Sequence, residues 1–517
     1  MKDNSRTKLA LMNASISTVV YIGNIVLKFI TRSIFIYFLG KEYLGVNGLF
    51  SSVISVLSLA ELGIGSSIVY SLYRPLAENN HAQVKTLMAL FRKVYNLIGF
   101  TVAIIGVILL PFLHYMINNP QGIKNVTSIY LLFLANSVVS YFFTYNRSLL
   151  SADQKNYVVI LNDFVFSIVI FLVQVGILLL TRNFLLYLLV QIFGTILGNI
   201  RLSKLVSKEY SYLKEFEIIS LEPETISMLK KNTFGNFLGK LGSVIVTSTD
   251  NILISSFVSL VAVGIYSNYL LVITSVQTLA IQIVTSVTAS IGNVGVSGDK
   301  ENELEIFRKH NFVNFTIVFF SSVLLMLCLN PFIRLWVGRS FELSFSIVIL
   351  IVLNYIVKGY RVSGWSFIDA YGLAWYVKLK PLIEIVVNIV MTLLLLFVFK
   401  FGISGVLLGT LFSALTVVGW WEPYAIFKYG LKQPFHIFGE IVGKHTLSLL
   451  TTVPFIALVL KFSPKGTLTA LIFNLFFGIL ISSVIYILYF SKTQEFIFVY
   501  TTSRKLFSSI VKKFSKK

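Results

Sequence analysis

Long apolar runs separated by short polar segments form the main pattern of the chain. Each run is roughly 20 to 28 residues long, the length at which an α-helix crosses the hydrocarbon core of a bilayer. We predict about fourteen such helices, at residues 12–39, 45–73, 94–117, 127–149, 158–181, 184–206, 233–258, 262–290, 312–336, 342–366, 381–400, 403–427, 441–461 and 467–490. The expected fold is therefore an all-α polytopic membrane protein.

Short sequence motifs occur twice in the same order. LGVNGLFSSVISVLS (44–58) resembles VGIYSNYLLVITSVQ (263–277), and FRK follows each of them. Later, RSLLSA parallels WSFIDA, and FGTILG parallels LGTLFS. We therefore predict two homologous six-helix halves in one orientation, with substrate bound at their interface near the middle of the membrane.

This repeat defines the predicted domain organisation. The N-terminal lobe covers 1–206, a cytoplasmic linker covers 207–231, and the C-terminal lobe covers 232–427. Two additional transmembrane helices at 441–490 and a basic cytoplasmic tail at 491–517 follow.

Composition and charge agree with a membrane protein. Of the 517 residues, 56% are hydrophobic and only 13% are charged, which excludes a soluble domain. With the N-terminus in the cytoplasm, about 31 of the 43 Lys and Arg residues fall in cytoplasmic segments. The net charge of +21 therefore orients the chain or contacts anionic lipid, and no nucleic-acid partner is expected.

Polar residues follow one face of several predicted spans. In the first span, residues three or four apart are polar: Asn13, Ser17, Tyr21, Asn24, Lys28 and Arg32. The same spacing recurs in the seventh span with Asn236, Lys240, Ser243, Thr247 and Asp250, and in the tenth with Asn354, Lys358 and Arg361. Three further charged residues lie within or at the ends of spans, namely Glu61, Arg147 and Glu384.

These charges have a structural and a functional interpretation. Lys28 and Arg32 could extend toward the interface, Arg147 and Arg361 could be inner-face anchors, and the acidic residues could form interhelical ion pairs. The functional interpretation is a solvated cationic cavity between the lobes. Such a cavity suits a diphosphate, which Arg holds in bidentate fashion and Lys as a point charge.

Catalytic signatures are missing from the sequence. The histidines have no metal-ligand spacing, and no phosphate-binding loop of the P-loop type occurs. We therefore expect neither an enzyme nor a bound cofactor or metal.

Several stretches carry a resemblance to a known family, over about residues 1–430. They are FLGKEYLGVNGLFSSVISVLSLAELGIGSSI, STDNILISSFVSLVAVGIYSNY, TASIGNV, WSFIDAYGL and GISGVLLGT. The sequence resembles the Wzx-type polysaccharide-repeat flippases of the multidrug/oligosaccharidyl-lipid/polysaccharide (MOP) superfamily. The resemblance implies a V-shaped pair of six-helix bundles that alternates between inward-open and outward-open states.

The implied substrate is an undecaprenyl-diphosphate-linked oligosaccharide, moved to the outer leaflet for capsule, exopolysaccharide, O-antigen-type or teichoic polymers. The resemblance implies that Lys28 and Arg32 engage the diphosphate, and the polar faces extend this role to other cations, namely Lys240, Lys358, Arg361 and Arg147. Coupling to sodium or protons is implied too, with Glu61 and Asp250 as candidates and Asn24, Glu384 and Asn354 as further cavity residues. The implied setting is the bacterial cytoplasmic membrane, with both termini inside and loose association with polymerases and glycosyltransferases.

Two other classes of protein stay open. A peptidoglycan-precursor flippase or a cation-coupled drug antiporter belongs to the same superfamily, although an antiporter favours buried carboxylates over buried cations. A membrane polymerase or glycosyltransferase would need a long external loop with catalytic residues, and the predicted external loops are short.

Overall fold

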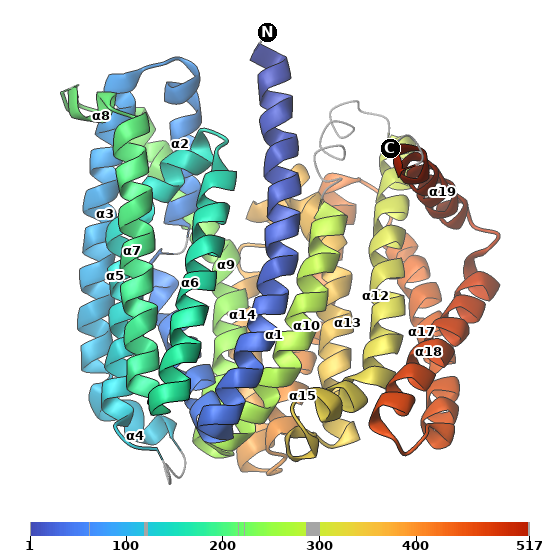
Figure 1. Cartoon of the computed structure of the whole chain (residues 1–517). Helices are drawn as coiled ribbons and strands as arrows, with labels where there is room; N and C mark the ends of the chain where they lie inside the picture. Colours follow the sequence, from blue (N-terminus) through green and yellow to red (C-terminus); the bar gives the residue numbers. More distant parts are fainter. Residues whose placement is uncertain are drawn as a thin grey trace. The chain divides into compact units, whose positions relative to one another are not determined.

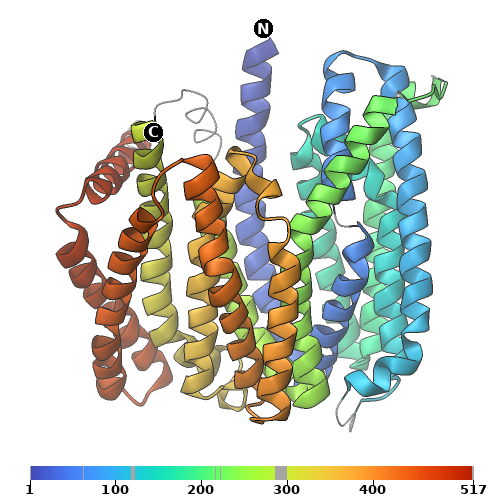
Figure 2. The same cartoon turned by 180° about the vertical axis from the view of Figure 1, so that it is seen from behind.

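The chain folds entirely into helices and connecting turns over the residues described by the computed structural model, which are 2–61, 63–117, 123–215, 217–221, 223–285 and 300–514. Figures 1 and 2 show the arrangement from opposite sides. The chain divides into two compact units, Met1–Ser267 and Asn268–Lys517. The lobes predicted from the sequence repeat, 1–206 and 232–427, divide the chain differently and stay a prediction.

The first unit is a bundle of long helices joined by short turns. It contains α1 (Lys2–Leu57), η1 (Ser58–Glu61), α2 (Ile64–Ala77), α3 (His81–Ile108), η2 (Leu110–Phe112), α4 (Leu113–Met116), α5 (Val126–Ala152), α6 (Asn156–Thr181), α7 (Phe184–Glu209), α8 (Tyr212–Glu215), α9 (Pro223–Phe257) and the start of α10 (Leu260–Thr285). Helix α5 packs between α3 and α7, and α1 packs against α6 and α9.

Helix α1 contains the first two predicted spans, and a kink separates them. Gly40 has φ 81° and ψ −176°, a conformation that side chains disfavour, so it marks the boundary between the spans 12–39 and 45–73. The second of these spans is not one helix, because α1 ends at Leu57 and α2 begins only at Ile64. The connecting 3-10 turn η1 carries Glu61.

Two glycines from corresponding positions of the sequence repeat meet where α1 crosses α10. A Cβ atom on Gly45 would lie 1.9 Å from the carbonyl oxygen of Leu260. A Cβ atom on Gly264 would lie 2.3 Å from the carbonyl oxygen of Lys41. Each glycine therefore faces the residue four positions before the other, and only glycine allows the two backbones to approach this closely.

The second unit contains the remaining helices. They are the rest of α10, α12 (Lys300–Trp336), η3 (Arg339–Phe341), α13 (Phe345–Ala370), η4 (Leu373–Trp375), α14 (Lys380–Phe397), α15 (Ile403–Ser413), η5 (Ala414–Val418), α16 (Gly419–Ala425), η6 (Ile426–Gly430), α17 (His436–Phe462), α18 (Thr467–Phe490) and α19 (Gln494–Phe514). The segments η5 and η6 are π-helical.

The two additional helices, α17 and α18, pack against α12 (Figure 2). The ring of His445 stacks on Phe315 with centroids 3.8 Å apart, and Tyr486 and Phe490 pack beside them. Polar contacts accompany this packing, since Asn474 Nδ2 donates to the Leu327 carbonyl at 2.8 Å. Helices α17 and α18 are therefore integral to the second unit.

The predicted spans correspond to helices throughout the described chain. Twelve helices there are long and apolar enough to cross a membrane. The predictions for 45–73 and 233–258 coincide with the end of α1 plus α2 and with α9. The end of the span 262–290 and the stretch TASIGNV lie outside the described residues. The chain is a multi-pass, all-α membrane protein, as its hydropathy pattern predicts.

Candidate functional site

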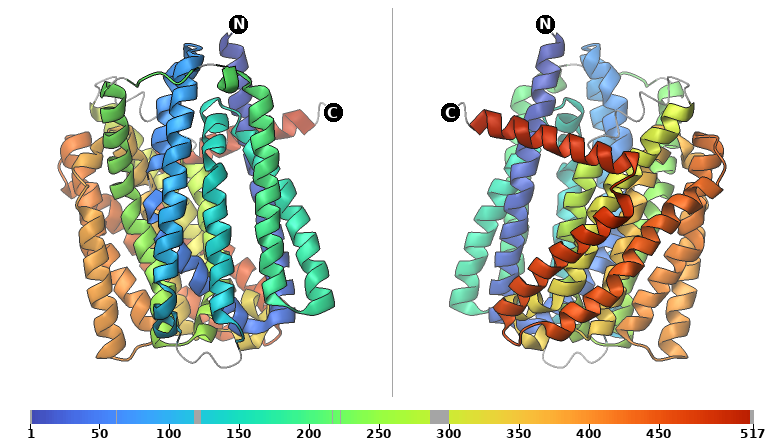
Figure 3. Two further views of the ribbon diagram at one scale, coloured as in Figure 1. Left: turned by 90° about the vertical axis from the view of Figure 1, so that its left-hand side faces the viewer. Right: turned by 90° about the vertical axis from the view of Figure 1, so that its right-hand side faces the viewer.

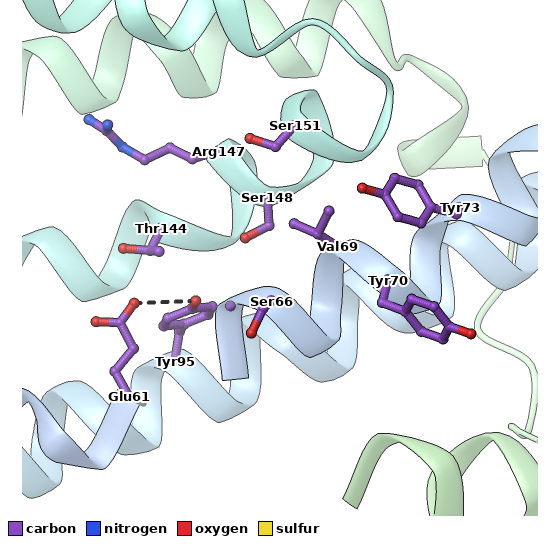
Figure 4. Close-up of a pocket in the computed structure, with 11 residues that line it drawn as sticks. Glu61, Ser66, Val69, Tyr70, Tyr73, Tyr95, Thr144, Arg147, Ser148 and Ser151 are labelled. Atoms are coloured by element: carbon purple, nitrogen blue, oxygen red, sulfur yellow. Dashed lines mark hydrogen bonds between the residues drawn. The ribbon is translucent and has the colours of Figure 1, made fainter. Parts of the chain in front are cut away.

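A pocket of about 500 Å³ in the first unit brings Glu61 and Arg147, two candidates from the sequence, into one lining (Figure 4). The turn η1 and helices α2, α3 and α5 supply its residues. Hydroxyl groups dominate the polar part of the lining, which includes Ser66, Tyr70, Tyr73, Tyr95, Thr144, Ser148 and Ser151.

Glu61 lies among tyrosine hydroxyls at one end of this pocket. The Tyr95 hydroxyl donates to Glu61 Oε1 at 3.4 Å (Figure 4). Tyr141, which donates to Ser58 Oγ at 2.8 Å, also lies near the carboxylate. Lys240 of α9 has an exposed side chain, and its positive charge interacts favourably with Glu61. Lys240 is therefore a candidate for the cation that the sequence analysis expects to pair with Glu61.

Arg147 is held by neighbouring helices. Its Nη1 lies 2.6 Å from Asp163 Oδ2 on α6, and Nε and Nη2 donate to Asn199 Oδ1 on α7 at 3.2 and 2.8 Å. Arg147 thus ties α5 to α6 and α7. A contribution to substrate binding stays a prediction.

Arg32 has a different environment. Its Nη1 donates to Ser267 Oγ on α10 at 2.8 Å, and Tyr187 lies nearby. No carboxylate lies within 4.0 Å of Arg32 among the residues that the structure describes. Lys28, one turn earlier on α1, has an exposed side chain, and Asn24 is half-buried. Arg32 and Lys28 are therefore positive groups that no described ion pair neutralises.

The start of the polar face of α1 has a structural role. Asn13 Nδ2 donates to the Gln154 carbonyl at 2.7 Å, and Asn13 Oδ1 accepts from the Tyr157 amide at 2.8 Å. Asn13 therefore holds α1 against the turn between α5 and α6.

The polar face of the seventh span is partly described. Asp250 on α9 is buried and interacts electrostatically with Tyr266. The side chains of Asn236 and Ser243 lie outside the described part of the structure.

The second unit holds a compact buried charge cluster centred on Glu422, which is 2% exposed. Arg361 contacts both carboxylate oxygens, with Nη2 at 2.9 Å from Oε1 and Nε at 3.1 Å from Oε2. Lys380 Nζ lies 2.5 Å from Oε1, and Trp365 Nε1 lies 3.4 Å from it. A bidentate arginine pair with a second cation is a strong arrangement for a buried carboxylate.

Two other predicted residues adjoin this cluster. Arg361 Nη1 lies 3.7 Å from Glu384 Oε1, and Lys358 is close enough to Glu384 to interact electrostatically. Asn354 instead donates to the backbone carbonyls of Leu350 and Leu407, at 2.9 and 3.0 Å. It therefore joins α13 to α15.

Glu422 and Lys380 were not among the residues predicted from the sequence. Glu422 lies near the end of the span 403–427 and Lys380 lies just before the span 381–400, and polar residues at span ends are ordinary. The helix that carries Glu422 is interrupted on both sides by the π-helical segments η5 and η6. Such segments are frequent at functional sites, but no short sequence pattern reveals them.

The two groups differ in charge balance. In the Glu422 cluster, Glu422 and Glu384 face Arg361 and Lys380, with Lys358 nearby, so the carboxylates offset most of the positive charge. The Arg32 region has no such compensation in the described structure. An anionic ligand would therefore be attracted more strongly to Arg32 and Lys28 than to the Glu422 cluster.

Comparison with known proteins gives structural likeness only. No protein-family model matches the sequence, and no curated protein matches it. An inward-facing multidrug resistance MATE transporter of the MOP superfamily matches 81% of this chain and 99% of its own, at 14% identity and a TM-score of 0.64. The lipid II flippase MurJ in an inward closed conformation matches 92% of this chain and 98% of its own, at 15% identity and a TM-score of 0.64. The Vibrio cholerae MATE transporter VcmN matches 84% of this chain and all of its own, at 15% identity and a TM-score of 0.56.

These likenesses identify the fold. The MATE transporters and the flippase MurJ share it, and the chain has a MOP-type fold over most of its length. At such low identity a shared fold does not determine the substrate.

Proposed function

We propose that the chain is a flippase that carries a polyprenyl-diphosphate-linked oligosaccharide from the inner to the outer leaflet by alternating access. The observation that carries this proposal is the likeness to the lipid II flippase MurJ, which extends over 92% of the chain. The MATE transporters compared above match 81% and 84% of it. The charge at Arg32 and Lys28 supports the same class of substrate.

Arg32 and Lys28 are the residues that we assign to the diphosphate. A diphosphate without counter-charges would face a prohibitive desolvation cost within the membrane. One N–H group of the Arg32 guanidinium donates to Ser267. A guanidinium carries five N–H donors, so others are left for a ligand. The exposed Lys28 adds a second positive charge one helical turn away.

The free energy of moving the anionic lipid outward has an electrical part and a concentration part. A membrane potential that is positive outside favours outward movement of negative charge, whereas accumulation of product opposes it, at about 2.3 kcal/mol per charge per 100 mV for the electrical part. We propose that binding of a sodium ion or proton drives the conformational cycle, with Glu61 and Asp250 as the candidate binding sites. The pocket hydroxyls around Glu61 are oxygen ligands of the kind that a hard cation requires.

A cation-coupled antiporter is the second candidate. The buried carboxylates Glu422 and Glu384 favour it, as does the likeness to the MATE transporters. Arg361 and Lys380 already neutralise these carboxylates, which weakens the case for a cationic substrate at this cluster. The external loops remain short for a polymerase.

The orientation of the chain in its membrane is inferred from the distribution of charge. We propose a bacterial cytoplasmic membrane with both termini on the cytoplasmic side, because most Lys and Arg residues then lie inside. Loose association with the polymerase and glycosyltransferases of the same pathway is part of this proposal.

The deciding experiment is the sidedness of lipid-linked oligosaccharide in cells depleted of the protein. Intact spheroplasts are probed with an impermeant glycan-binding reagent, before and after permeabilisation. Accumulation on the inner leaflet supports a flippase. Accumulation on the outer leaflet contradicts it and points to a later polymerisation step, and no accumulation favours the antiporter.

Charge reversal at Arg32 tests the assigned site. Arg32→Glu should reduce polymer export at least about tenfold, because a charge change of two units beside a diphosphate removes an attraction and adds a repulsion. Arg32→Lys should retain part of the export, and Arg182→Glu, at the exposed turn after α6, serves as the matched control. Protein level and thermal stability are measured in parallel. Normal export in a stable Arg32→Glu variant would contradict the assignment.

A further inference from the structure

The C-terminal helix α19 has the register of a helix that lies in a membrane interface. By helical spacing, Phe496 and Val499 near the start of α19 and Phe507, Ile510 and Phe514 near its end share one face. By the same spacing, Arg504, Lys505 and Lys512 fall on the other side of the helix. A helix with a basic face and an apolar face is typical of binding to an anionic membrane surface.

The path of α19 agrees with this position. In Figure 3 the helix crosses the long helices of its own unit at a steep angle, at the end where α12 begins. Its first turn is fixed to the unit, because Thr493 Oγ1 accepts from the Phe496 amide at 3.3 Å and Phe496 packs near Tyr486 with centroids 5.7 Å apart. Ile497 and Tyr500 are exposed beyond this anchor.

A cavity of about 240 Å³ lies where α12, α17 and α18 meet the start of α19. Its floor is apolar, with the buried rings of Phe312 and Phe490. Two cations, Arg308 and Lys444, line it together with two carboxylates, Glu440 and Glu495.

These four charged side chains form no direct ion pairs in the described structure. Among the described residues, no ion pair within 4.0 Å joins any of them. Arg308 Nε is buried without a hydrogen-bond partner, and Lys444 Nζ lies 5.4 Å from the Phe490 ring centroid. A buried guanidinium N–H without a partner is costly, so Arg308 holds an unsatisfied hydrogen-bond donor next to the cavity.

We infer that this cavity binds the headgroup of an anionic glycerophospholipid whose headgroup carries hydroxyl groups, as phosphatidylglycerol does. The phosphate accepts from Arg308 and contacts Lys444, and the headgroup hydroxyls donate to Glu440 and Glu495. The apolar floor receives the glycerol and the start of an acyl chain. The inference does not depend on the proposed transport substrate.

Labelling of the unmodified protein is the first test. The full chain is reconstituted in nanodiscs of phosphatidylcholine, with or without phosphatidylglycerol, and acylation of each lysine by an amine-reactive reagent is measured by mass spectrometry. Phosphatidylglycerol should slow acylation of Lys444 several-fold, whereas acylation of Lys461, at the far end of α17, should change little. Equal changes at both lysines would contradict a specific site.

Variants and a free-phosphate arm complete the test. The binding of phosphatidylglycerol, measured by native mass spectrometry, should weaken on the order of tenfold in Arg308→Gln/Lys444→Gln. It should persist in the charge-conserving Arg308→Lys/Lys444→Arg and in the control Arg339→Gln/Lys461→Gln, which removes two charges near the opposite ends of the same helices. Unchanged binding in the first variant would overturn the inference. Equal protection of Lys444 by inorganic phosphate would overturn the lipid assignment. Polymer export, measured separately, bears on the proposed function and not on this site.

Discussion

At the scale of single residues, Glu422 is expected to make a large contribution to the stability of the second unit. Glu422→Gln would leave Arg361 and Lys380 buried without a full counter-charge, and breaking a buried ion pair in this way costs about 3–5 kcal/mol. The expected result is a marked fall in the thermal unfolding temperature of the protein in detergent. Glu78→Gln, which breaks the exposed pair with Arg74, is the control and should cost about 0–1 kcal/mol.

A second variant distinguishes charge balance from packing at this cluster. Glu422→Gln/Lys380→Met removes one cation together with the carboxylate, so part of the lost stability should return. If the double variant is less stable than the sum of the two single changes predicts, the cluster is not held by charge compensation.

The stability contributed by the turn between α5 and α6 should depend on pH. Lys155 Nζ lies 2.7 Å from Asp153 and 2.6 Å from Glu209, and the Tyr210 hydroxyl donates to Asp153 at 2.6 Å. Burial opposes the charge of Lys155, but hydrogen bonds to the two carboxylates outweigh it and raise its pKa. Burial, reinforced by Asp153, raises the pKa of Tyr210. Both groups therefore hold their protons more tightly in the folded state than in the unfolded state.

The stability from this turn should be complete below pH about 10 and be lost as the pH rises through the raised pKa values. The measurement is thermal unfolding of the unmodified protein and of Lys155→Met/Tyr210→Phe between pH 8 and 11. The difference between the two proteins should shrink above pH about 10. Lys124→Met, at an exposed position, is the control. A difference that stays constant or widens at high pH would contradict the assignment.

At the scale of helices, the crossing of α1 and α10 is the most constrained contact. In Gly264→Ala the new Cβ would meet the backbone oxygen of Lys41, so the helices must separate, at a cost of about 1–3 kcal/mol. Gly443→Ala, in α17, is the matched control, because no atom lies within 4 Å of its Cβ position. Alanine favours a helix there, so thermal unfolding should show no loss. A tolerated Gly264→Ala would mean that the crossing is looser than the structure shows.

The helices were largely predictable from the sequence, because about twenty consecutive apolar residues leave few alternatives to a membrane span. The repeat also placed Gly45 and Gly264 in corresponding positions, although their contact was not foreseen. The interruption between Leu57 and Ile64 and the π-helical segments around Glu422 could not be predicted, because they depend on packing between distant segments.

The candidate site was less predictable than the fold. The polar residues within spans included Arg361 and Glu384 but not Glu422 and Lys380, since helix periodicity reports which residues share a face and not which faces meet. It also grouped Asn13 and Asn354 with the charged residues, although both bind backbone groups of neighbouring helices. Their hydrogen bonds depend on tertiary contacts that the spacing does not encode.

At the scale of the whole molecule, α17 and α18 belong to the second unit and pack against α12. Lipid can cover an apolar helix face, so hydrophobic burial alone would not hold these helices in place. Specific contacts do so: His445 Nδ1 lies 2.8 Å from the Tyr360 hydroxyl, Thr316 Oγ1 lies 2.6 Å from the Tyr486 hydroxyl, and Asn474 contacts α12.

A chain cut after residue 430 should therefore reach the membrane but be less stable than the full chain, because polar groups of α12 and α13 lose their partners to lipid. The two fragments 1–430 and 431–517 are expressed separately and together, and the level and unfolding temperature of the first are measured. Co-expression of the second fragment should restore both, and the change His445→Leu in that fragment should weaken the rescue. A first fragment as stable alone as in the full chain would show that α17 and α18 serve another purpose, such as contact with lipid or a partner.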